Sequence, residues 1–122
     1  MLIKDFYKII ALSSDDSGIV ATIKLNPNHE VYKGHFPNQP VVPGVIQLQI
    51  IQELMEKHLG TKLFMGSIKR VKYLTPIIPL TSPELAFKLK NEKIESRSIK
   101  SEVSISSNDI IFTKAKIEFS IT

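Results

Sequence analysis

One segment of helical periodicity stands among several short segments of alternating apolar and polar residues. Over residues 44–58 the apolar positions recur with helical spacing, and Gly60 follows where a C-terminal cap is expected. Turn-forming residues fill 13–18 and 26–30. The remaining β-branched segments predict strands at 6–12, 19–25, 63–74, 84–91, 98–106 and 110–120. Strands in series around one apolar helix predict an α+β fold, in which an antiparallel sheet wraps one long central helix.

Length and composition narrow the class of protein. The 122 residues fit a single domain over 1–122. There is no apolar run of about 18 residues and no signal-peptide pattern, so we expect a cytoplasmic protein with no membrane partner. Cysteine is absent and the three histidines are scattered, so neither a metal site nor a cofactor is expected.

A histidine on a proline-rich loop is the main candidate for chemistry. His35 precedes the predicted helix, and prolines 37, 40 and 43 restrict the loop to few conformations. An imidazole titrates near neutral pH and can therefore act as a base. The first N–H groups of the helix have no partner within it and can bind a ligand oxygen. The segment suits a positioned catalytic side chain.

Residues 34–44, Gly-His-Phe-Pro-Asn-Gln-Pro-Val-Val-Pro-Gly, resemble the active-site segment of the 3-hydroxyacyl-[acyl-carrier-protein] dehydratases, which have the hotdog fold. Residues 70–79 resemble the basic, aromatic strand and Pro-x-x-Pro turn of that family. The resemblance implies dehydration of a 3-hydroxyacyl thioester of an acyl carrier protein, in fatty acid or related acyl-chain biosynthesis. It implies that His35 removes the α-proton, that the Gly44 N–H binds the thioester oxygen, and that the Val41 carbonyl orients the imidazole. The substrate-contacting positions that it implies are Tyr32, Phe36, Val41, Pro43 and Val45.

Tyr32 is open to two interpretations, a residue lining the substrate tunnel or an ordinary core tyrosine.

Two positions on the helix depart from the family pattern. The family has its catalytic Glu or Asp where this chain has Gln49, and often has Gln where this chain has Glu53. An amide cannot donate a proton, but residues four apart on a helix are neighbours. Either Glu53 has taken over as the acid, directly or through a water, or it is structural and dehydration is lost. Without the resemblance, both residues would be assigned, with Gln52 and Glu56, to a solvent-facing arc.

The resemblance also bears on partners. Family members form dimers with a continuous sheet, in which the histidine of one subunit faces the carboxylate of the other, so a homodimer or a larger assembly of dimers is expected. The alternative is a carrier-binding subunit with reduced activity that supplies His35 to a heterodimer with a Glu-bearing paralogue. A hotdog thioesterase is less favoured, because those enzymes generally lack the His-Phe-Pro loop.

The formal net charge of +4 favours acidic partners. Basic residues are dispersed along the chain except for Lys69, Arg70 and Lys72. This cluster is either a solvated strand face or a docking surface for the acidic carrier protein. No interleaved aromatic residues accompany it, so no nucleic-acid partner is expected.

Overall fold

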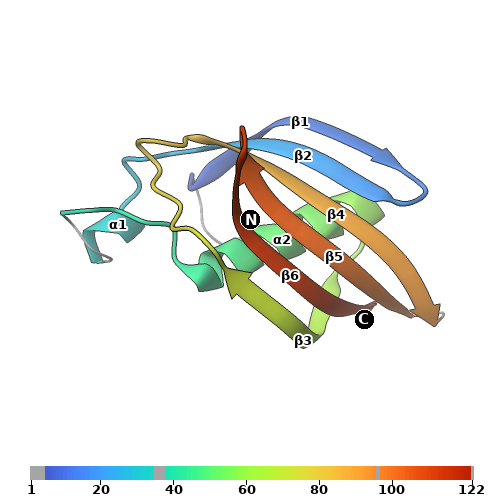
Figure 1. Cartoon of the computed structure of the whole chain (residues 1–122). Helices are drawn as coiled ribbons and strands as arrows, with labels where there is room; N and C mark the ends of the chain where they lie inside the picture. The colour runs from blue at the N-terminus through green and yellow to red at the C-terminus, as the bar shows by residue number, and fades with distance from the viewer. Residues whose placement is uncertain (1–4, 35–37, 96, 122) are drawn as a thin grey trace.

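A curved antiparallel sheet wraps around one long helix (Figure 1). The computed structural model describes residues 5–34, 38–95 and 97–121. Within them one sheet of six strands has the order β1-β2-β4-β5-β6-β3, and every neighbouring pair is antiparallel. The elements are β1 (Tyr7–Asp15), β2 (Gly18–Leu25), α1 (Val31–Gly34), α2 (Gly44–Leu59), β3 (Leu63–Tyr73), β4 (Glu84–Glu95), β5 (Ser98–Ser107) and β6 (Ile110–Ile121). The predicted α+β hotdog arrangement is confirmed.

The core lies between the concave face of the sheet and α2. Alternate residues of β2, β4, β5 and β6 point toward the helix, as the period of two requires, and the helix directs its apolar side chains at them. Burial of each large apolar side chain contributes about 1.5–3 kcal/mol. The side chains that are almost fully buried include Ile23, Leu25, Ile50, Ile51, Leu54, Met55, Leu85, Phe87, Leu89, Ile117 and Phe119.

The ends of α2 follow local rules. Pro43, with φ −60°, precedes the helix and gives it no side-chain cap. Gly60 ends it in the left-handed conformation, with φ 70°, and its N–H donates to the Glu56 carbonyl at 2.8 Å. The predicted stop is therefore confirmed.

Two local predictions were inaccurate. Residues 13–18 were assigned to a turn, but β1 continues to Asp15, whose carboxylate accepts the N–H groups of Ser17 and Gly18 at 2.8 and 3.2 Å. The short helix α1 was not predicted, because a single turn has no periodicity. It begins where the Val31 N–H donates to His29 Nδ1 at 3.0 Å.

The edge strand β3 leaves large apolar side chains exposed. It pairs on one side with β6 and has no neighbouring strand on its other side among the described residues. Phe64, Ile68 and Tyr73 are 62%, 46% and 52% exposed, and Leu74 just beyond the strand is 54% exposed. Natural proteins rarely leave a long apolar edge uncovered. The described residues therefore leave an apolar strand edge open along β3.

Candidate active site

A buried glutamine fastens the start of α2 to the loop before it and to the sheet. Gln47 is 4% exposed; its Nε2 donates to the Val42 carbonyl at 3.2 Å, and its Oε1 accepts from Thr113 Oγ1 at 2.5 Å. The Val42 N–H in turn donates to the Ile77 carbonyl at 2.9 Å. The helix N-terminus is thus held in a fixed position. Sequence reasoning missed Gln47, although a glutamine within the apolar part of a helical pattern is a signal for such a bond.

A tyrosine ring covers the first residue of α2. A Cβ atom added to Gly44 would lie 2.6 Å from both Cζ and the hydroxyl oxygen of Tyr73. Glycine is required here for this close approach. Partial burial raises the pKa of Tyr73 still further above neutral pH, where the phenol is protonated and can donate a hydrogen bond. Tyr73 was recognised only as an aromatic residue of the strand.

The exchanged pair on α2 is joined by a hydrogen bond. Gln49 Nε2 donates to Glu53 Oε2 at 3.0 Å, and the Tyr7 hydroxyl of β1 donates to Glu53 Oε1 at 2.8 Å. Burial, and secondly the hydrogen bond to Glu53, raise the pKa of Tyr7, so this phenol remains a donor. Each oxygen of the carboxylate therefore accepts a bond. The amide nitrogen of Gln49 donates to Glu53. The amide oxygen of Gln49, Oε1, is therefore the atom of that side chain that can accept a hydrogen bond from a substrate.

The polar arc of α2 is not a simple solvent face. Gln49, Gln52, Glu53 and Glu56 are all half-buried. Gln52 Nε2 donates to the Leu63 carbonyl at 3.1 Å, and the Leu63 N–H donates to Glu56 Oε2 at 2.9 Å. These two residues fasten the helix to the start of β3, while Gln49 and Glu53 bind each other and Tyr7.

The other predicted site residues are in varied surroundings. His35 and Phe36 lie outside the described residues. Val41 and Pro43 are half-buried, whereas Val45 is 72% exposed.

Tyr32 is 4% exposed and packs against Phe6 with ring centroids 5.6 Å apart. Its hydroxyl has no hydrogen-bond partner among the described residues, and burial raises its pKa. The ring is part of the core, and its role at the site stays a prediction.

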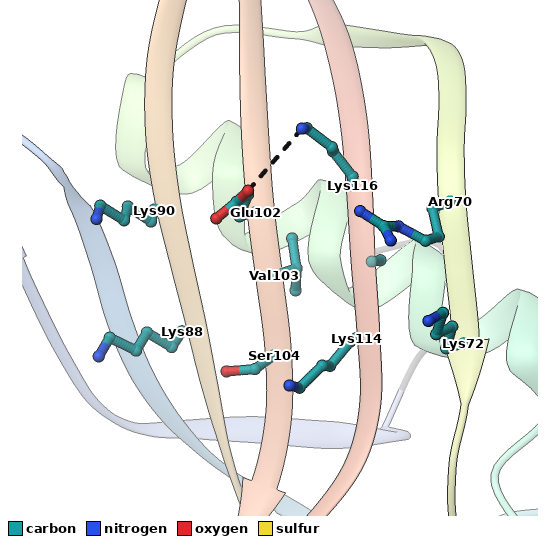
Figure 2. A pocket seen from close by; sticks show the side chains of 10 residues that line it. Arg70, Lys72, Lys88, Lys90, Glu102, Val103, Ser104, Lys114 and Lys116 are labelled. Carbon is teal, nitrogen blue, oxygen red and sulfur yellow. Dashed lines mark ion pairs between the residues drawn. The ribbon is translucent and has the colours of Figure 1, made fainter.

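The predicted basic cluster divides between two environments. Lys69 Nζ lies 3.9 Å from a carboxylate oxygen of Glu118, next to a register shift between Ile68 and Arg70. Arg70 and Lys72 instead line a groove on the outer face of the sheet, with α2 behind it (Figure 2). Two of the three residues therefore line the groove, and Lys69 lies outside it, paired with an acidic residue.

Within the described residues, no three His, Asp or Glu side chains gather in a way that could hold a metal ion. In the same part of the chain, no helix is long and apolar enough to cross a membrane.

Comparisons with known proteins bear on the class and the family. The dehydratase heterocomplex ApeI:P from Xenorhabdus doucetiae has a chain with a TM-score of 0.73 and 22% identity, covering 93% of this chain and 96% of that one. The 3-hydroxyacyl-[acyl-carrier-protein] dehydratase FabZ of Lactobacillus helveticus is 25% identical over 97% of this chain and 86% of its own length. FabZ of Clostridium acetobutylicum is 27% identical over 43% of this chain and 42% of its own length.

The fold and these similarities define a hotdog protein of the dehydratase type. Residues 11–113 match the family model described as ApeI-like, ApeI dehydratase, so the chain belongs to the ApeI-like dehydratase family. Membership in this family confirms the predicted relationship to the 3-hydroxyacyl-[acyl-carrier-protein] dehydratases. It also confirms the predicted enzyme class, a dehydratase-like lyase, at the level of the family.

Proposed function

We propose that this protein dehydrates 3-hydroxyacyl thioesters of an acyl carrier protein at a site completed by a second subunit. The observation that carries the proposal is the Tyr7–Glu53–Gln49 chain of hydrogen bonds, on the same helix whose N-terminus is held by Gln47. The names of the FabZ relatives supply the substrate class. The exposed edge of β3 supplies a surface for the second subunit.

The reaction needs a base, a site for negative charge and a proton for the leaving group. His35 takes the α-proton, and enolate charge on the thioester oxygen is stabilised by the Gly44 N–H, at the positive end of the helix dipole. The carbon–oxygen bond at the β-carbon then breaks as the double bond forms. The hydroxide leaves as water once it receives a proton, which Glu53 supplies when the protein acts without a different partner subunit. Gln49 Oε1 accepts a hydrogen bond from the 3-hydroxyl group and holds it, but Gln49 cannot supply that proton.

A second candidate function follows from the source of this proton. Both carboxyl oxygens of Glu53 accept hydrogen bonds, from Tyr7 and from Gln49, so neither is aimed as a donor at a substrate hydroxyl group. The related ApeI:P structure is named as a heterocomplex. Both observations favour a subunit that supplies His35 and the hydroxyl-binding Gln49, while a partner subunit supplies the carboxylic acid.

The test measures formation of the enoyl thioester from a carrier-linked 3-hydroxyacyl thioester by mass spectrometry. Wild type, His35→Ala, Gln49→Glu and Glu53→Gln are assayed alone and mixed with a relative that has a carboxylate at the position of Gln49. If Glu53 is the acid, wild type alone is active and Glu53→Gln is inactive. If a partner supplies the acid, wild type alone is inactive, and either Gln49→Glu or the mixture gains activity.

Activity of His35→Ala within a few-fold of wild type would overturn the assignment of the base. Inactivity of wild type, Gln49→Glu and every mixture would overturn dehydration itself.

Docking of the carrier on Lys69, Arg70 and Lys72 remains a prediction. Arg70 and Lys72 lie on the face of the sheet that points away from α2, so a carrier bound there would have to pass its thioester around a sheet edge. Reversal of these charges should weaken turnover of carrier-linked substrate and leave small thioester analogues unaffected. Equal loss on both substrates would indicate a structural role.

A further inference from the structure

Six basic side chains gather on the outer face of the sheet, although they are far apart in the sequence. Arg70 and Lys72 of β3, Lys88 and Lys90 of β4, and Lys114 and Lys116 of β6 line a groove of about 460 Å³ (Figure 2). Ser104 and Glu102 of β5 lie between them. The chain has 16 basic and 12 acidic residues, and this groove holds six of the former and one of the latter, so the rest of the chain is close to neutral. We call this surface the basic face.

The strand register places the cations in two rows across the sheet. Lys72 is directly opposite Lys114, and Arg70 is directly opposite Lys116. Rows two residues apart along a strand are separated by about 7 Å, and neighbouring strands by about 4.8 Å. Like charges directly opposite each other destabilise a sheet. Among the described residues that line the groove, Glu102 is the acidic one, and it lies 4.0 Å from Lys116. An arrangement that opposes folding in this way fits a surface that binds an anionic partner.

The composition of the basic face indicates which anionic partner fits. Five of its six cations are lysines and no aromatic side chain lines it. Protein interfaces are enriched in arginine and aromatic residues and depleted in lysine. Recognition of single-stranded nucleic acid also needs aromatic residues for stacking. Lysine ammonium groups on flexible side chains, with no aromatic residue to fix the position of a partner, suit mobile phosphate groups that have no fixed geometry.

We propose that the basic face docks the protein on the surface of an anionic lipid bilayer. The absence of a long apolar run and of a signal-peptide pattern predicted no membrane partner from the sequence, and the grouping of the lysines on one face changes that expectation. The interaction is peripheral and electrostatic, and it is independent of the proposed dehydratase function. A second subunit added along β3 would extend the same face of the sheet, because Arg70 and Lys72 lie on that edge strand.

The test is sedimentation of the full chain with vesicles of phosphatidylcholine, with or without phosphatidylglycerol. Each lysine near an anionic surface contributes about a fivefold factor to partitioning, so Lys88→Gln/Lys90→Gln/Lys114→Gln should weaken binding about 100-fold. The matched control, with exposed lysines elsewhere replaced by the same residue, should stay within about threefold of wild type. It is Lys33→Gln/Lys57→Gln/Lys62→Gln, whose exposed lysines lie on α1, on α2 and between α2 and β3. Binding should vanish in about 0.5 M salt, where the screening length is only about 4 Å.

A variant that is expected to bind more tightly tests whether the loss of binding in the lysine variants is caused by misfolding. Glu102→Gln removes the single carboxylate of the basic face and should tighten binding about fivefold. Equal loss in the two triple variants would overturn the proposal, as would equal binding to pure phosphatidylcholine or no binding by wild type. Tighter binding to duplex DNA than to vesicles at equal phosphate concentration would replace the bilayer by nucleic acid.

Discussion

Two buried tyrosines differ in what their hydroxyl groups contact, and this difference predicts opposite effects of the same substitution. The Tyr7 hydroxyl donates to Glu53 at 2.8 Å, whereas the Tyr32 hydroxyl is buried with no partner among the described residues. Replacing either by phenylalanine keeps the ring. Tyr7→Phe removes a hydrogen bond to a charged group, worth about 1.5–3 kcal/mol, and the partial exposure of Glu53 puts the expected loss near the lower end.

Tyr32→Phe should leave the free energy of unfolding unchanged or raise it by up to about 1 kcal/mol, because it removes a polar group that was desolvated without compensation. Both variants are measured by urea unfolding, followed by circular dichroism at one protein concentration, since subunit association alters apparent stability. The denaturant slope should not change. Equal destabilisation by the two substitutions would show that the Tyr32 hydroxyl has a partner, and would refute the reasoning.

Three further predictions concern the same region. Stability should fall above about pH 10, by about 1.4 kcal/mol per pH unit for each of Tyr7 and Tyr32, because burial raises their pKa and only the unfolded chain releases these protons. Phenolate absorbance should therefore appear together with unfolding; its appearance in the folded protein near pH 10 would contradict this. Gly44→Ala should displace the Tyr73 ring and lower kcat/KM more than about tenfold, while the free energy of unfolding changes by less than about 1 kcal/mol, since alanine favours helices. Gln47→Leu should cost about 2–4 kcal/mol in urea unfolding, because it leaves both buried hydrogen-bond partners unsatisfied; a cost below about 1 kcal/mol would contradict that role.

The features that the sequence predicted best are those with a local cause. Helical periodicity and the glycine at position 60 predicted that the helix ends at residue 58, one residue before the observed end of α2 at Leu59. The i,i+4 spacing predicted the contact between Gln49 and Glu53. The end of β1 was placed too early because serine and aspartate favour turns but also occupy exposed strand positions.

Features made by distant segments were missed. Tyr7 and Glu53 are 46 residues apart, and no pattern within the helix indicates that a strand supplies a donor to it. The basic face requires the strand order and the register of β3, β4 and β6, neither of which periodicity determines.

The exchange of acid and amide also predicts an order among the variants that restore an acid. Gln49→Glu alone places two carboxyl groups one helical turn apart, and like charges at this spacing repel, so one of them keeps a proton to higher pH. The double variant Gln49→Glu/Glu53→Gln restores a lone acid beside an amide, without that repulsion. Rate profiles against pH for the two variants should therefore differ, with activity of the single variant persisting to higher pH. Superimposable profiles would mean that the carboxyl group of Glu53 does not sense the group at position 49, and that the pair does not act as a unit.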